Sequence, residues 1–230
     1  MKKLVFLAGA LSDAYVWTQQ VAAFSCDYEL YCPDVRDHDS LEDMAQAVLD
    51  AVPGPFALVA ASLGARIALE VYRKAPERVE RLAFIAASIS PIDDGELARR
   101  QDGIYKARKL GMEAVAKAYL PRMVHPSLHD DTAFMGGVIA MACRYTPDAL
   151  EREAKMLLKR PDQQPLLATI TCPTLVLAGS DDALTPLERT QDIAGAIAAA
   201  KIVLVDEAAH FPMLERPEAV NVALREWLAA

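Results

Sequence analysis

Three residue types that together perform acyl transfer occur in this chain, each within a few residues of the end of an apolar run. Ser62 lies in the string Ala60-Ala61-Ser62-Leu63-Gly64, Asp182 follows the apolar residues 175–178, and His210 follows the apolar residues 202–205. A serine hydroxyl is a poor nucleophile until a base takes its proton, and the usual base is a histidine oriented by a carboxylate. The three residues predict attack of a hydroxyl on an acyl carbonyl.

The string around Ser62 joins two different elements. Residues 56–59 are uniformly apolar, as in a buried strand, and residues 65–72 have the pattern of a helix packed on it. Small residues two before and two after a serine allow a tight turn, which presents the hydroxyl beside the backbone N–H groups of the helix N-terminus. The alternative is that Ser62 only caps this helix.

A base and an acid are expected at the same edge of the sheet. Ligand and catalytic groups in open α/β sheets gather at the carboxyl ends of the strands, and His210 follows the last predicted strand. The other histidines lie in an early loop or in a helical segment: His38, His125 and His129. Of the two acids after residues 175–178 we select Asp182, because Asp181 is suited to capping the turn. The alternative is that Asp181 and Asp182 both only shape the loop.

The elements that must position these residues alternate along the chain. Strands are predicted at residues 4–7, 28–31, 56–60, 81–86, 174–178 and 202–205, and helices at 15–24, 41–52, after Ser62, at 187–199 and at 217–228. This alternation predicts the α/β class, with a mostly parallel, doubly wound sheet and helices on both faces.

The strand signal disappears in one long segment. Glycines and prolines break it into short helices, and we expect a helical cap at residues 89–170 inserted into a core formed by residues 1–88 and 171–230. Five methionines fall in the cap, where they either line an adaptable pocket or fill the core: Met112, Met123, Met135, Met141 and Met156.

Composition excludes several classes of partner. The net charge is −8 and the isoelectric point is near 5.1, which argues against nucleic acid and anionic membranes. No apolar run reaches the roughly 18 residues that cross a bilayer, and the apolar start at residues 4–11 is better explained as a first strand than as a secretion signal. We expect a cytoplasmic protein.

Cofactor motifs are also missing from the sequence. It has no HExxH pair, no clustered Cys and His set and no GxGxxG after a strand, so we expect neither a metal nor an organic cofactor. The cysteines lack paired metal-ligand spacing and are expected to be buried, reduced thiols: Cys26, Cys32, Cys143 and Cys172.

Taken in order, these segments resemble the α/β-hydrolase superfamily. Leu7-Ala8-Gly9-Ala10 is similar to its oxyanion loop, residues 173–179 with Asp182 to its acid-bearing strand, and His210-Phe211-Pro212 to its terminal histidine region. The resemblance implies backbone N–H groups of Ala10 and Leu63 as the oxyanion hole. Ala8 replaces the family's usual histidine, and Ala60 its usual glycine.

The resemblance implies a serine carboxylesterase that cleaves small or medium esters or thioesters with an apolar acyl group through an acyl-enzyme. Candidate substrate contacts are Arg66, Arg122, Met123 and Phe211. One alternative is a hydrolase or lyase of C–C bonds in enolic or diketone acids, with Arg66 or Arg122 binding a substrate carboxylate. The competing expectation for Arg66 is a salt bridge to a loop carboxylate. A second alternative is a ligand-binding member without chemistry.

Overall fold

The computed structural model describes residues 1–91, 93–198 and 200–230. Within them, six parallel strands form one sheet in the order β2-β1-β3-β4-β5-β6. The strands are β1 (Lys2–Leu7), β2 (Tyr28–Tyr31), β3 (Phe56–Ala61), β4 (Val79–Ile85), β5 (Thr174–Gly179) and β6 (Ala200–Val205). The predicted α/β class with a parallel sheet is confirmed, and β3, which leads to Ser62, lies between β1 and β4.

Helices cover both faces of this sheet, which explains why its central strands are apolar without alternation. Every residue of β3 and β5 is buried. Alternate residues of β1 enter different cores: Phe6 packs in the core with Trp17, and Leu7 packs in the core on the other face. A parallel strand buried on both faces must be apolar throughout.

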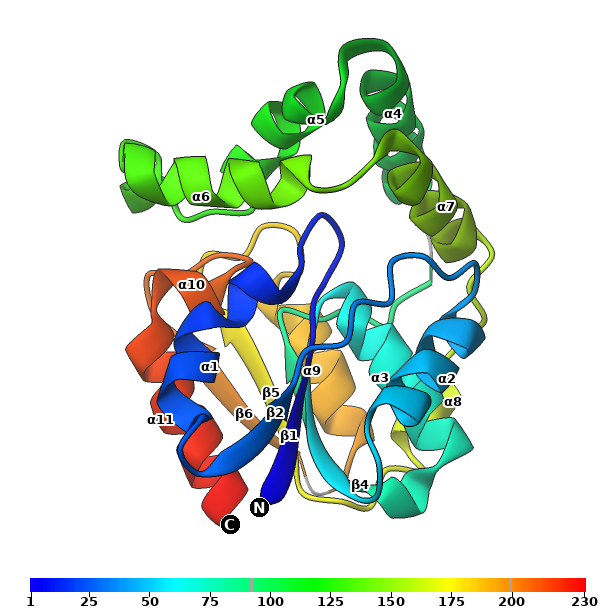
Figure 1. Ribbon diagram of the computed structural model, residues 1–230, viewed down its shortest axis with the longest axis vertical. Helices are drawn as coiled ribbons and strands as arrows, with labels where there is room; N and C mark the ends of the chain where they lie inside the picture. Colours follow the sequence, from blue (N-terminus) through cyan, green and yellow to red (C-terminus); the bar gives the residue numbers. More distant parts are fainter. Residues whose placement is uncertain (92, 199) are drawn as a thin grey trace.

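The helices of the two faces come from different parts of the chain (Figure 1). α2 (Leu41–Ala51), α3 (Leu63–Lys74) and α9 (Leu187–Ala196) contribute to the core that contains Leu7. The short helix η1 (Ala14–Trp17), α1 (Thr18–Phe24), α10 (Pro212–Glu215) and α11 (Pro217–Ala229) contribute to the opposite core. The predicted helix at 187–199 thus ends earlier, and Ala199 itself is outside the described residues.

A layer of helices lies over the carboxyl ends of the strands (Figure 1). It contains α4 (Asp94–Leu110), α5 (Met112–Tyr119), α6 (Thr132–Cys143) and α7 (Pro147–Leu158), and α8 (Gln164–Leu167) leads back to β5. The sequence defines the starts of these helices, because Asp93, Asp131 and Thr146 each accept a hydrogen bond from a backbone N–H of the first turn. Gly111, at φ 85°, separates α4 from α5.

The five methionines of residues 89–170 and the four cysteines differ in burial. Four cap methionines are buried and Met135 is partly buried, so most of them fill the core. The expectation of buried cysteines was wrong: Cys26 and Cys143 are exposed, and Cys32 and Cys172 are partly buried. Their spacing carried no information on burial, because each lies near a helix end or a loop. In the described part of the chain, no helix combines the length and apolar character that crossing a bilayer requires.

Candidate active site

Ser62 lies on a sharp turn between β3 and α3. Its backbone has φ 50° and ψ −116°, in a region that costs a non-glycine residue about 1 to 3 kcal/mol. Its side chain makes no capping hydrogen bond to α3, so the explanation of Ser62 as a helix cap is wrong. A Cβ atom on Gly64 would lie 2.7 Å from the carbonyl oxygen of Leu7, and one on Gly9 would lie 2.8 Å from the Ser62 Cβ. Glycine at both positions therefore allows the turn.

The hydroxyl of Ser62 points to the imidazole of His210. Ser62 Oγ lies 3.1 Å from Nε2 of His210, and Nδ1 of His210 lies 2.8 Å from Oδ2 of Asp182. His210 is 2 % exposed and Asp182 is 4 % exposed. The structure thus brings together a hydroxyl, an imidazole and a carboxylate from three loops at the carboxyl edge of the sheet.

Asp182 is held as a carboxylate by its surroundings. Oδ1 accepts backbone hydrogen bonds from Leu184 and Thr185, both at 2.9 Å, and Oδ2 accepts one from the Thr185 hydroxyl. Burial alone raises the pKa of Asp182, but attraction to His210 and these hydrogen bonds outweigh burial and lower the pKa below its ordinary value. Asp181 instead accepts from Ser180 and is half exposed, so Asp182 is the acid that faces His210.

Close packing of two loops sets the distance between Asp182 and His210. A Cβ atom on Gly179 would lie 2.3 Å from the carbonyl oxygens of Ala208 and Ala209, so the end of β5 touches the loop after β6. The Glu215 carboxylate supports that loop, because it accepts backbone hydrogen bonds from Ala209 at 3.0 Å and from Phe211 at 2.9 Å. The roles of Thr185 and Glu215 were not predicted, because their nearness to Asp182 and His210 in the chain is the one signal that the sequence carries for them.

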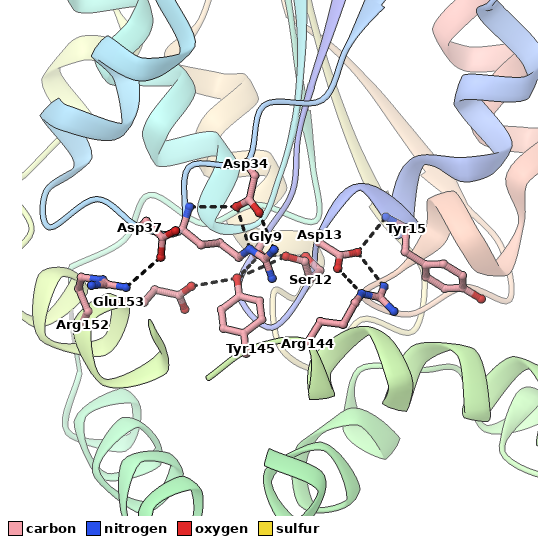
Figure 2. A network of polar contacts seen from close by, with 11 residues as sticks. Gly9, Ser12, Asp13, Tyr15, Asp34, Asp37, Arg144, Tyr145, Arg152 and Glu153 are labelled. Atoms are coloured by element: carbon pink, nitrogen blue, oxygen red, sulfur yellow. Dashed lines mark hydrogen bonds and ion pairs between the residues drawn. The ribbon is translucent and has the colours of Figure 1, made fainter. Parts of the chain in front are cut away.

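The loop after β1 brings Ala10 to the same place. Ala10 and Leu63 line the cavity into which Ser62 opens. Leu63 is the first residue of α3, so its N–H has no acceptor within the helix. Ala8 cannot brace this loop through a polar side chain. Instead, Ser12 Oγ donates to the Gly9 carbonyl at 2.8 Å, as seen in Figure 2.

Tyr145 and Glu153 connect the helical layer to that loop (Figure 2). The Tyr145 hydroxyl lies 3.3 Å from the Ser12 carbonyl, 3.3 Å from Oε2 of Glu153 and 3.5 Å from the Gly9 carbonyl. Arg36 lies 5.0 Å from the centre of the Tyr145 ring. Glu153 is 5 % exposed, and burial raises its pKa to about 7 although nearby Arg100 and Tyr145 oppose the shift.

Replacing Glu153 with glutamine is expected to make folding stability less sensitive to pH. The folded pKa of about 7 exceeds the ordinary 4.5, so the native state retains a proton that the unfolded chain has lost. Stability therefore falls as pH rises from 4.5 to about 7, and the cost, at most about 3 kcal/mol, is fully present above that range.

Urea unfolding at about pH 5 and about pH 9 checks this expectation. Glu153→Gln should gain stability relative to wild type at the higher pH and much less at the lower one. Glu226→Gln, which alters an exposed glutamate on α11, is the control. Parallel pH curves for wild type and Glu153→Gln would contradict the expectation.

The cavity beside Ser62 has a volume of about 350 Å³. Three of the four candidate substrate contacts line it: Arg66, Arg122 and Met123. Phe211 does not; it is buried edge-on against the His210 ring, with ring centres 5.8 Å apart. The expected pairing of Arg66 with a loop carboxylate is wrong, because its guanidinium binds the Gln163 side chain at 3.3 Å and the Ser90 carbonyl at 2.7 Å. Among the described residues, no group of His, Cys, Asp and Glu could hold a metal ion.

A parallel six-stranded sheet with a serine on a strand-to-helix elbow and a histidine after the last strand defines the α/β-hydrolase class of fold. Residues 4–223 match the sequence profile of the Alpha/beta hydrolase family, and the chain belongs to this family.

Relatives of the chain include several esterases. A pimeloyl-acyl-carrier-protein methyl ester esterase of Nitrosomonas europaea is 26 % identical over 94 % of this chain and 91 % of its own length. A putative non-heme bromoperoxidase of Mycobacterium tuberculosis is 27 % identical over 99 % of this chain and 94 % of its own. The structure of a thermophilic esterase from Thermogutta terrifontis has a TM-score of 0.92 at 25 % identity, and the match covers 100 % of this chain and 90 % of that one.

Proposed function

We propose that this protein is a serine esterase that cleaves small or medium carboxylic esters or thioesters through an acyl-enzyme. The observation that carries the proposal is the chain of contacts from Ser62 Oγ to His210 Nε2 at 3.1 Å and from His210 Nδ1 to Asp182 at 2.8 Å. Esterases among the family relatives support the reaction type.

In the proposed mechanism, Ser62 attacks the acyl carbonyl while His210 Nε2 takes the hydroxyl proton. The alcohol leaves with that proton and the acyl group remains on Ser62. A water molecule then attacks the acyl-enzyme with His210 again as the base, which releases the acid and restores the hydroxyl. Asp182 accepts the Nδ1 proton of His210, fixes the ring and stabilises the imidazolium that forms in each half-reaction.

The negative oxygen of each tetrahedral intermediate would be bound by backbone N–H groups of Leu63 and Ala10. Loss of one such donor typically costs about 3 kcal/mol of transition-state stabilisation. In this proposal residues 89–170 act as a cap whose helices close the cavity over the acyl group and reduce its contact with water. Met123 and Leu157 form apolar parts of the wall of that cavity.

A panel of p-nitrophenyl esters of increasing acyl length tests the reaction, and a fluorophosphonate probe tests the nucleophile. We expect saturable hydrolysis of at least one ester and a covalent adduct on the peptide that contains Ser62. Heat-denatured protein is the control for non-specific labelling. Absence of both turnover and labelling would refute the proposal.

A second candidate is hydrolysis or elimination at a C–C bond of an enolic or diketone acid by the same three residues. The guanidinium of Arg66, which lines the cavity without a carboxylate partner among the described residues, is the observation that favours it. Turnover of an enol-acid panel without turnover of any ester would select this reaction.

A further inference from the structure

Three arginines and a single glutamate meet in the wall of the Ser62 cavity. The Ser90 carbonyl accepts hydrogen bonds from Arg66 Nη2 at 2.7 Å and from Arg160 Nη2 at 3.2 Å, so these two guanidinium groups lie beside one oxygen. The Glu96 carboxylate accepts from Arg100 at 2.7 Å and from Arg160 at 2.7 Å. We call Arg66, Glu96, Arg100 and Arg160 the arginine cluster, and all four line the cavity.

The arginine cluster carries a net charge of +2 inside a protein whose net charge is −8. Among the described residues that line the cavity, the arginines are Arg66, Arg99, Arg100, Arg122, Arg160 and Arg189, and the acids are Asp93, Glu96 and Glu153. Burial raises the pKa of Glu153 to about 7, so this acid offsets little of the excess below neutral pH. The cavity is therefore a local positive site in an acidic molecule.

Arg66 is the member without a counterion. Its two guanidinium contacts are neutral oxygens, those of Gln163 and Ser90, and the residue is 5 % exposed. Burial, with repulsion from Arg160, lowers its pKa to about 10. Two carboxylates attract Arg66 without a direct contact. Glu96 is bound to Arg100 and Arg160, and Asp162 is exposed and accepts a hydrogen bond from its own loop at 2.9 Å. A buried charge beside like charges is costly unless an anion joins it.

The arginine cluster lies in the same cavity as the proposed nucleophile Ser62. Arg66 lies in the first turn of α3, which begins directly after Ser62, and Arg66 and Ser62 line the same cavity. Glu96 places one carboxylate between Arg100 and Arg160, and Arg160 Nε is buried without a hydrogen-bond partner among the described residues. The cluster therefore keeps positive charge that an anion can pair with, and Arg66 is its member without a salt bridge.

We infer that the arginine cluster is a subsite for an anionic group of the substrate, a carboxylate or a phosphate located away from the scissile carbonyl. The natural substrate is then a charged ester, such as the half-ester of a dicarboxylic acid. This inference about the substrate rests on the proposed function, whereas anion binding itself does not.

Binding to Ser62→Ala protein tests the subsite without turnover. We expect isothermal titration to detect monomethyl glutarate more tightly than dimethyl glutarate, its neutral counterpart. Arg66→Gln, Arg100→Gln and Arg160→Gln in the same background should each weaken binding of the half-ester about 10-fold or more, because each removes charge-assisted hydrogen bonding. Lys109→Gln removes one exposed charge from α4 outside the cavity and is the matched control. If one variant fails to fold, the other two still decide the result.

Hydrolysis rates of three p-nitrophenyl esters of matched acyl length extend the test to catalysis. The esters are the glutarate, the phosphonobutyrate and the neutral valerate. A higher kcat/KM for the glutarate or for the phosphonobutyrate than for the valerate identifies which anion is preferred, and Arg66→Gln should reduce that preference about 10-fold. The subsite is refuted if the half-ester and the diester bind equally, or if Lys109→Gln weakens binding as much as Arg66→Gln. Half-ester binding without hydrolysis of any ester would leave the subsite standing and refute only the proposed function.

Discussion

Ser62→Ala is expected to lower kcat for ester hydrolysis by on the order of 10⁴-fold or more. The variant keeps the cavity and the backbone donors but removes the atom that forms the acyl-enzyme, and enzymes of this kind lose nearly all of their covalent catalysis with the nucleophile. The positive φ of Ser62 is retained in the variant, so folding stability should change little. Rates with the best p-nitrophenyl ester and thermal unfolding of both proteins measure the two effects.

Ser25→Ala is the control for this experiment, since Ser25 is exposed at the end of α1, on an element remote from the elbow. It should retain wild-type kcat. Unchanged hydrolysis by Ser62→Ala at full purity would show that another group performs the attack.

Local patterns predicted the sheet and the places of the three candidate catalytic residues. The predicted strands are short, mostly apolar runs that become parallel strands, and in such a sheet the loops at carboxyl ends must meet at one edge. Ser62, Asp182 and His210 each follow a strand by a few residues, so topology alone brings them near one another. Their hydrogen bonds depend on Gly179 and Glu215, whose contacts the pattern does not show.

The arginine cluster could not be predicted from any local pattern. Its members come from α3, from α4 and from the segment after α7, and the contact between Glu96 and Arg160 spans 64 positions. The partner expected for Arg66 was wrong for the same reason. An arginine among apolar residues in the first turns of a helix indicates a buried polar contact. Only the packing of the cap decides whether a carboxylate, an amide or a carbonyl is nearest.

Phe211 was expected to contact the substrate, but the structure buries it in the core. Its neighbour His210 contacts Ser62 Oγ through Nε2. The chain turns into α10 at this point, so Phe211 points into the core formed with α11 and stacks edge-on against the imidazole. The side chain therefore packs against the ring of His210 and does not line the cavity.

Asp182→Asn is expected to reduce kcat by roughly 10³- to 10⁴-fold while leaving the fold intact. The asparagine oxygen can still accept the N–H groups of Leu184 and Thr185, which directs its NH₂ group towards His210. An NH₂ donor beside Nδ1 favours the tautomer with the proton on Nε2. His210 would then donate to Ser62 instead of accepting its proton.

Stability measurements on the same variant separate this effect from misfolding. The folded pKa of Asp182 is below its ordinary 3.8, so the carboxylate contributes stability above that value and loses it as pH falls through the folded pKa. Asp182→Asn should thus be less stable than wild type at neutral pH, and the difference should shrink in acid. Asp181→Asn, which changes the half-exposed neighbouring carboxylate, should retain wild-type kcat. If Asp181→Asn lost activity and Asp182→Asn kept it, the acid would be assigned to the wrong residue.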